Sequence, residues 1–189
     1  MNVYDFDNTI YKGESALHFF FYYIKKTPSL LKYCPRVFYA LIKYKAGKIT
    51  VEKALEDYAP AVEEYIRSIP DLKADAVDFW DKHIKNIKPF YKELQRDDDV
   101  IVTGSPENTM QEVCKRLGIK HCVGSLIDEE TGKITRLCIR SRKVPAFFEA
   151  FPDAEIENFY TDSPKNDAPL IELSKNAYHV KGNKIIKIK

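Results

Sequence analysis

The feature that most constrains the fold is one strand pattern followed by a long helical stretch, after which strands and helices alternate. Residues 2–6 form a short apolar run typical of a buried strand. From residue 15 to about residue 88 the pattern is helical, with little sign of strands. From residue 89 onward, short β-branched and aromatic runs alternate with helical segments. Alternation of this kind predicts a mostly parallel sheet covered by helices.

Capping and first-turn residues divide the helical stretch into several predicted helices. Those that start a helix are Ser15, Pro28, Pro35, Thr50 and Asp71. Pro60 lies inside an otherwise helical pattern. Because proline removes a backbone donor and clashes with the preceding turn, we expect the helix from Thr50 to run only toward Tyr58.

The second part of the chain predicts the repeating units of the sheet. Its expected strands are residues 99–103, 157–161, 177–180 and 185–188, with a hairpin turn at 128–132. The expected helices are one capped by Ser105 and closed by Gly118, one over 143–150 and one over 168–174. The predicted fold is therefore α/β, with a Rossmann-like, mostly parallel sheet flanked by helices. Residues 1–12 and 89–189 would form its core, and residues 13–88 an inserted all-helical cap domain.

The composition is that of an ordinary globular chain. Hydrophobic residues make up 44% and aromatic residues 13%, enough for a packed core. The 30 Lys and Arg against 28 Asp and Glu leave a net charge of +2, so charge gives no reason to expect a nucleic-acid partner. The most apolar stretch, residues 15–24, is about half of what a membrane span needs, and no span is expected. Only four residues precede Asp5, too few for a signal peptide. The four cysteines are scattered, as is typical of reduced thiols: Cys34, Cys114, Cys122 and Cys138. We therefore expect a cytoplasmic protein.

Three predicted strands end in residues suited to chemistry. Asp5 and Asp7 stand two residues apart where the first strand ends, and Thr103 and Asp162 follow later strands. The carboxyl ends of parallel strands share one edge of a sheet, where active sites gather. Two carboxylates this close suit a hard cation together with a nucleophile or general acid. The alternative for an isolated D-x-D is a solvated turn or helix cap.

Two further segments suit an anionic ligand. In Thr103-Gly104-Ser105, a hydroxyl at a strand end is followed by glycine and a helix start, where free N–H groups and the helix dipole favour a phosphate. The alternative is an ordinary strand end followed by an N-cap. Lys143 begins a predicted helix, where a cation is electrostatically misplaced unless it holds an anion. Arg140 and Arg142 compete with Lys143 for that role, and a solvated basic turn is the other interpretation.

Taken in order, these segments resemble the four motifs of the haloacid-dehalogenase-like (HAD) phosphohydrolases. The first, D-x-D-x-T, matches residues 5–9, and Thr103 takes the place of the second-motif hydroxyl. The wording T-G-S-P-E is close to the S-x-S-P-E form of the phosphoserine-phosphatase-like subgroup. Lys143 takes the third-motif place. Asp162 and Asp167 match the fourth, with one residue more between them than in G-D-x-x-x-D and with Thr161 where glycine is commoner.

The resemblance implies a magnesium-dependent phosphatase that hydrolyses a phosphate monoester of a small metabolite through an aspartyl-phosphate. Asp5 would be the nucleophile and Asp7 the general acid and base. Thr103, Gly104 and Lys143 would bind the phosphoryl oxygens. The implied ligands of Mg²⁺ are Asp5, Asp7 through its backbone carbonyl, and Asp162, with Asp167 contacting a metal-bound water.

The substrate is less constrained. Glu14 lies nine residues after Asp5, where phosphoserine phosphatases have a glutamate that faces the substrate amine, so a phosphoserine-like substrate is one hypothesis. Its alternative is a helix N-terminal acid favoured by the dipole. Two other functions stay open. A phosphotransferase would pass the phosphoryl group to an acceptor alcohol. A non-enzymatic protein would bind a phosphate ligand, or would dock on a membrane or a partner through the basic, aromatic first half of the helical stretch.

Overall fold

The centre of the protein is a seven-stranded sheet in the order β4-β3-β2-β1-β5-β6-β7. The structure, a computed structural model, describes the backbone of residues 1–189 and every side chain except those of residues 37, 41, 44, 45, 51, 52, 55, 56, 58 and 59. The strands are β1 (Asn2–Tyr4), β2 (Val100–Pro106), β3 (His121–Ile127), β4 (Ile134–Arg136), β5 (Asn158–Thr161), β6 (Asn176–Lys181) and β7 (Lys184–Lys187). β1 pairs in parallel with β2 on one side and with β5 on the other. β2 pairs in parallel with β3, and β5 with β6. The edge strands are antiparallel: β4 pairs with β3, and β7 with β6. The predicted Rossmann-like, mostly parallel sheet is confirmed.

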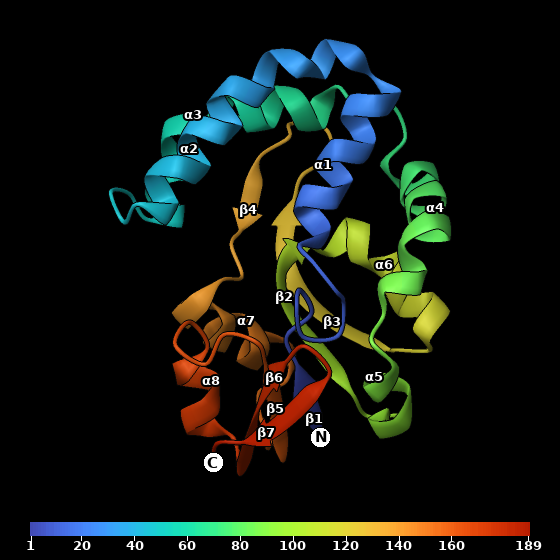
Figure 1. Cartoon of the computed structure of the whole chain (residues 1–189), viewed down its shortest axis with the longest axis vertical. Coiled ribbons are helices and arrows are strands. Elements are labelled where there is room, and N and C mark those ends of the chain that lie inside the picture. The colour runs from blue at the N-terminus through green and yellow to red at the C-terminus, as the bar shows by residue number, and fades with distance from the viewer.

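Alternation along the strands builds a hydrophobic core on each face of the sheet. Val3 and Phe159 belong to one cluster, which α7 (Lys143–Ala150) and α8 (Ala168–Leu173) cover. The next residue of β1, Tyr4, belongs to the other cluster, because side chains of a strand point to opposite faces in turn. That second face is covered by α4 (Leu72–His83), α5 (Pro89–Leu94) and α6 (Glu107–Leu117), as Figure 1 shows.

Only helices are present between β1 and β2 in the described chain. Before α4 and α5 come α1 (Ser15–Lys26), η1 (Pro28–Tyr33), α2 (Cys34–Lys45) and α3 (Val51–Arg67), and η2 (Ile84–Asn86) lies between α4 and α5. Figure 1 shows α1, α2 and α3 beyond the end of the sheet toward which β2 and β3 point. In the part of the chain described, no helix combines the length and apolarity that crossing a membrane requires.

The last long helix of this stretch rests on the core. Trp80 of α4 donates its indole N–H to the carbonyl of Thr109 in α6 at 2.8 Å. Its ring also meets Phe6 edge to face, with the centroids 5.9 Å apart. The inserted stretch is therefore anchored at its C-terminal end, whereas its division from the core at residues 13–88 stays a prediction.

The helix that begins after Thr50 is longer than we expected. Thr50 and Asp71 do cap helices, because their side chains accept the N–H groups of Lys53 at 3.1 Å and Ala74 at 2.9 Å. The expected end near Tyr58 is wrong, since α3 continues through Pro60 to Arg67. Proline removes one backbone hydrogen bond, but the following turns carry Tyr65, whose ring packs 5.6 Å from that of Phe20, and this packing favours continuing the helix.

Ser105 is not the N-cap that we expected. β2 runs on to Pro106, and α6 starts at Glu107 with no side-chain cap. The Ser105 hydroxyl instead bonds to Asp7 at 3.1 Å and to the hydroxyl of Ser15 at 2.9 Å. A side chain that already has these partners is not available to cap the helix.

The β3–β4 turn touches the inserted helices at Gly132. Gly132 has a φ of +74°, and a Cβ there would lie 2.4 Å from the carbonyl oxygen of Glu63 in α3. Gly182 has a similar φ of +63° with nothing within 4 Å of its Cβ position, so it is a matched control for the backbone term alone. We predict that Gly182→Ala costs about 1–2 kcal/mol of unfolding free energy. Gly132→Ala should cost roughly 1–3 kcal/mol more because of overpacking.

The two variants are compared by urea denaturation of the whole chain. Equal losses in both would mean that the β3–β4 turn does not pack on α3.

Candidate active site

A tight turn directly after β1 brings both acids of the D-x-D pair to one place. The Asp5 N–H donates to the carbonyl of Tyr160, which continues the pairing with β5. The N–H groups of Thr9, Ile10 and Tyr11 then all donate to the carbonyl of Phe6. Because the strand ends in this turn, Asp7 comes back to the same edge, where its carboxyl feels the charge of Asp5.

The Lys143 ammonium group lies between two carboxylates. It is 2.7 Å from Asp5 Oδ1 and 2.9 Å from Asp167 Oδ1, and all three side chains are buried. Burial alone would lower the pKa of Lys143, but the two carboxylates outweigh it and raise that pKa well above its usual range. The cation is therefore held at the edge of the sheet, at the first residue of α7, by Asp5 and Asp167.

Two threonine hydroxyls fix the geometry of these acids. Thr9 Oγ1 donates to Asp5 Oδ2 at 3.2 Å and accepts the N–H of Asp162 at 2.7 Å, so it joins the ends of β1 and β5. Thr161 Oγ1 donates to Asp167 Oδ2 at 2.6 Å. Both threonines are completely buried. Neither was predicted as a site residue, although Thr9 ends the D-x-D-x-T segment and Thr161 directly precedes Asp162.

Asp7 is surrounded by hydroxyl and amide donors. Its Oδ1 accepts the N–H of Ser15 at 2.8 Å, and its Oδ2 accepts the hydroxyl of Ser105 at 3.1 Å. Burial raises the pKa of Asp7 to about 7, the hydrogen bonds from Ser15 oppose the shift, and the charge of Asp5 adds to it. A carboxyl with that pKa exchanges a proton near neutrality, as a general acid must. Neither serine was among the predicted site residues.

Thr103 and Gly104 lie in the second half of β2, shortly before α6 begins at Glu107. Thr103 is fully buried, and its Oγ1 accepts the N–H of Ser105 at 3.1 Å. As the acceptor in that bond, the hydroxyl keeps its own proton to donate. The carbonyl of Gly104 accepts the hydroxyl of Ser125 at 2.8 Å, which ties this part of β2 to β3.

Asp162 provides a test of whether a divalent cation suits the site. Burial, then the charges of Asp5 and Glu14, raise the pKa of Asp162 to about 7. Neighbouring carboxylates that disfavour each other's charge are what a hard cation with oxygen ligands would stabilise. Among the described side chains, no group of three His, Cys, Asp or Glu residues is arranged to hold a metal. Two carboxylates, the Asp7 carbonyl and water would be a smaller donor set, and such a set suits Mg²⁺ because this ion keeps several waters.

Glu14 lies near the acids but does not act as a helix cap. It stands at the N-cap position of α1, yet its side chain makes no cap hydrogen bond. Its Oε1 instead accepts the side-chain amide of Asn8 at 2.6 Å. Burial and the charge of Asp5 raise the pKa of Glu14. The carboxyl is thus within the electrostatic field of the site, and its contact with substrate stays a prediction.

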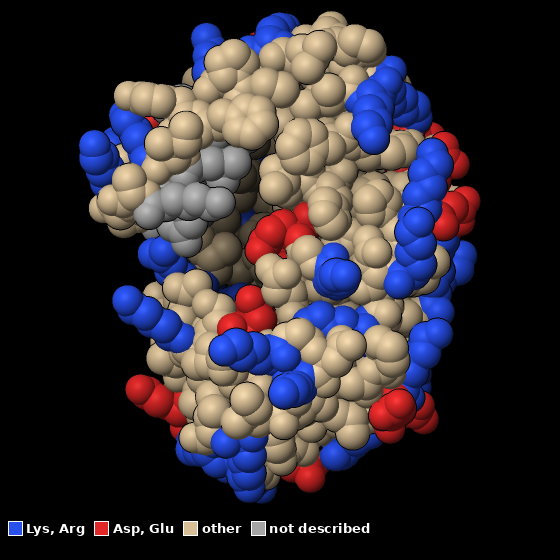
Figure 2. Space-filling model, in the orientation of Figure 1, with Lys and Arg blue, Asp and Glu red and all other residues tan. Residues whose placement is uncertain are grey.

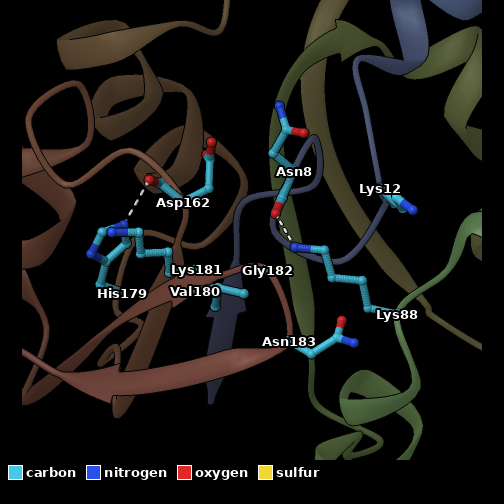
Figure 3. A pocket seen from close by; sticks show the side chains of 9 residues that line it. All are labelled: Asn8, Lys12, Lys88, Asp162, His179, Val180, Lys181, Gly182 and Asn183. Carbon is cyan, nitrogen blue, oxygen red and sulfur yellow. Dashed lines mark hydrogen bonds between the residues drawn. The ribbon is translucent and has the colours of Figure 1, made fainter.

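A pocket of about 570 Å³ opens beside Asp162. Figure 3 shows Asp162 on one side of it and Asn8 and Lys88 on the other. The Lys88 ammonium donates to the carbonyl of Asn8, and burial lowers its pKa while the charge of Asp162 opposes that shift. In Figure 2 a hollow below the upper helices has acidic side chains at its edge. The pocket thus places Asn8, Lys88 and Asp162 around one open space beside the candidate site.

The arrangement matches a known family. The family model described as haloacid dehalogenase-like hydrolase matches residues 3–172. The chain belongs to the haloacid dehalogenase-like hydrolases. None of the curated proteins matches it.

Solved structures share the fold. A protein of unknown function from Bordetella pertussis Tohama I has a TM-score of 0.75 and 18% identity, covering 94% of this chain and 87% of its own. A phosphoserine phosphohydrolase-like protein from Francisella tularensis subsp. tularensis SCHU S4 has a TM-score of 0.60 and 21% identity, covering 94% and 86%. A substrate-bound phosphoserine phosphatase complex has a TM-score of 0.53 and 15% identity, covering 93% and 82%. The structural neighbours thus include phosphoserine-phosphatase-like HAD proteins.

The Thr9 hydroxyl can be tested without reference to activity. Thr9→Val keeps the shape of the side chain but leaves the buried N–H of Asp162 without its acceptor, so we predict a loss of about 1–3 kcal/mol in unfolding free energy. Thr9→Ser keeps the hydroxyl and is the control; it should lose only the packing of one methyl group. Chemical denaturation measures both. Equal stabilities of the valine and serine variants would contradict the bridging role of the hydroxyl.

Proposed function

We propose that the protein is a magnesium-dependent phosphatase that hydrolyses phosphate monoesters of small metabolites through an aspartyl-phosphate on Asp5. Membership of the HAD-like hydrolases supports a phosphatase-like function. The strongest support for the proposal is that Asp5 and Asp7, two residues apart, have different surroundings. Asp5 faces the Lys143 ammonium at 2.7 Å, whereas Asp7 has a pKa of about 7. One acid lies beside a cation in position to attack, and the other is able to carry a proton.

In the first half-reaction, an oxygen of Asp5 attacks phosphorus and the bond to the leaving oxygen breaks. Asp7, 3.1 Å from Ser105 Oγ, gives its proton to that leaving oxygen. In the second half-reaction, Asp7 takes a proton from a water, which attacks phosphorus and releases phosphate from Asp5. Uncatalysed monoester hydrolysis is so slow that the catalyst must supply about 20 kcal/mol, and the covalent route divides that demand between two steps.

The remaining residues bind and orient. The Lys143 ammonium and the Thr103 hydroxyl would neutralise and position the phosphoryl oxygens, with the backbone at Gly104 beside them. Asp5, Asp162 and the Asp7 carbonyl would hold Mg²⁺, which supplies positive charge to the phosphoryl group when it is bound. Glu14, which lies in the field of Asp5, would face an amine of the substrate, so a phosphoserine-like compound is the first substrate to test.

Asp5→Asn should abolish turnover, because an amide does not attack phosphorus while its shape is nearly that of the carboxylate. Phosphate release from p-nitrophenyl phosphate measures the effect, and circular dichroism verifies the fold. Asp97→Asn, the same change at an exposed position, should keep full activity. Activity of Asp5→Asn within about tenfold of wild type would falsify the nucleophile, given the far larger enhancement the reaction needs.

The pKa of about 7 at Asp7 predicts a pH dependence. Below that pH the carboxyl holds the proton that an alkoxide leaving group needs; above it the proton is lost, so turnover of an alkyl phosphate should fall as pH rises through about 7. A p-nitrophenolate leaving group needs no proton, so turnover of p-nitrophenyl phosphate should fall less steeply on the alkaline side of the pH profile. Asp7→Asn should lower alkyl phosphate turnover by roughly 10²–10⁴ and remove its fall with rising pH. The same fall in the variant would exclude Asp7 as the acid.

Metal dependence is tested through binding as well as activity. EDTA should silence the wild-type protein, and added Mg²⁺ should restore it. Mg²⁺ should also raise the melting temperature. The increase should be smaller below pH 7, because the pKa of Asp162 is about 7 and protons then compete with Mg²⁺ for its carboxylate. Asp162→Asn should lose the thermal shift, while the exposed Asp153→Asn should keep it. Activity and melting that ignore both EDTA and Mg²⁺ would exclude the metal.

A further inference from the structure

The first half of the helical stretch is strongly one-sided in charge. Residues 15–50 contain no Asp or Glu, although the chain has 28 of them. The same segment holds seven basic residues, namely Lys25, Lys26, Lys32, Arg36, Lys43, Lys45 and Lys48. Lys26 and Lys32 form ion pairs with Asp75 and Glu64 of later helices, but the segment itself remains basic on a chain whose net charge is only +2.

Large apolar side chains are exposed in the same segment. The exposed fractions are 40% for Phe21, 55% for Leu31, 47% for Phe38, 53% for Tyr39 and 65% for Ile42. They lie on α1, η1 and α2, and η1 packs against both helices. Phe38 and Ile42 are four residues apart in α2 and so share one face of that helix. A solitary exposed apolar residue needs no explanation, but a set of five on consecutive elements marks an interaction surface.

Basic and aromatic groups are interleaved on this surface. The ammonium of Lys43 lies 4.4 Å from the centre of the Tyr39 ring, and that of Lys32 lies 4.9 Å from the centre of the Tyr33 ring. Figure 2 shows Lys and Arg side chains along the upper edge of the molecule, where Figure 1 places η1 and the start of α2. Helices with bulky apolar residues beside Lys and Arg lie in the interface of anionic bilayers.

The charge pattern selects among partners. A second copy of the chain presenting the same surface would bring basic residues against basic residues with no acid between residues 15 and 50 to pair with them. Nucleic acid would use the basic groups but give no apolar environment to Leu31 and Ile42. A bilayer with anionic headgroups takes both, since its surface attracts lysines and its acyl boundary accepts apolar side chains.

We propose that the surface formed by α1, η1 and α2 docks the protein on anionic phospholipid bilayers. Phe38 and Ile42 enter the headgroup region, while exposed basic residues such as Arg36 and Lys48 contact the lipid phosphates. α1, which carries Phe21 of this surface, begins at Ser15, whose N–H donates to Asp7, so one helix reaches from the surface to the candidate active site.

Co-sedimentation of the full chain with vesicles tests the docking surface. Vesicles of phosphatidylcholine and phosphatidylglycerol should bind the protein, with affinity falling as salt rises, and pure phosphatidylcholine vesicles should not. Arg36→Gln with Lys48→Gln should weaken binding about 25-fold, at about fivefold for each charge. Phe38→Ser with Ile42→Ser should weaken it by at least about tenfold.

Matched pairs on the core domain control for charge and for apolar exposure. Two double variants should bind vesicles as wild type does: Lys120→Gln with Lys184→Gln, and Leu173→Ser with Ile186→Ser. The side chains of Leu173 and Ile186 are 49% and 46% exposed. Unchanged melting temperatures show that all variants fold. Binding that is absent, that is equal on neutral vesicles, or that is lost equally in the control pairs would overturn the proposal. So would binding lost in the charge variant but unchanged in the apolar one. A change in oligomeric state on gel filtration caused by the apolar variant would assign the surface to a second copy instead.

Discussion

The buried ammonium of Lys143 between Asp5 and Asp167 is the interaction on which the rest of the site depends. A carboxylate withdrawn from water favours its neutral form unless a cation lies beside it. The Lys143 ammonium lies 2.7 Å from Asp5 and 2.9 Å from Asp167; its charge lowers the pKa of Asp167, but burial outweighs it and that pKa is raised. Lys143 also joins the first residue of α7 to the end of β1 and to the start of α8, so packing on one face of the sheet sets the position of the acid at its edge.

Three aspartates of the same site differ because their partners differ. Asp5 has a lysine, Asp7 has amide and hydroxyl donors from Ser15 and Ser105, and Asp162 has a backbone bond to Thr9 and the field of Asp5. The pKa values of Asp7 and Asp162 are both raised to about 7, chiefly by burial. The proposed roles of nucleophile, proton carrier and metal ligand would therefore depend on these different partners and not on a difference in pKa between Asp7 and Asp162.

Local patterns in the sequence predicted most of the fold and the acids of the site. The parallel sheet, the helical stretch and the caps at Thr50 and Asp71 follow from periodicity and capping chemistry, which depend on neighbours in the chain. What could not be predicted depends on distant contacts. Pro60 stays helical because later turns of α3 pack well. Ser105 does not cap α6, because its hydroxyl bonds to Asp7, which lies 98 residues earlier in the chain. The bridging role of Thr9 could not be predicted, because its partner Asp162 follows β5 and comes close only when β5 pairs with β1.

The stereochemical course at phosphorus tests the central claim most directly. Hydrolysis of a monoester made chiral with oxygen isotopes, in isotopically labelled water, gives phosphate whose configuration can be read by nuclear magnetic resonance. Transfer to Asp5 and then to water is two in-line displacements, and each inverts phosphorus, so the account predicts net retention. Net inversion would mean that water attacks the substrate directly, and it would contradict an aspartyl-phosphate on Asp5.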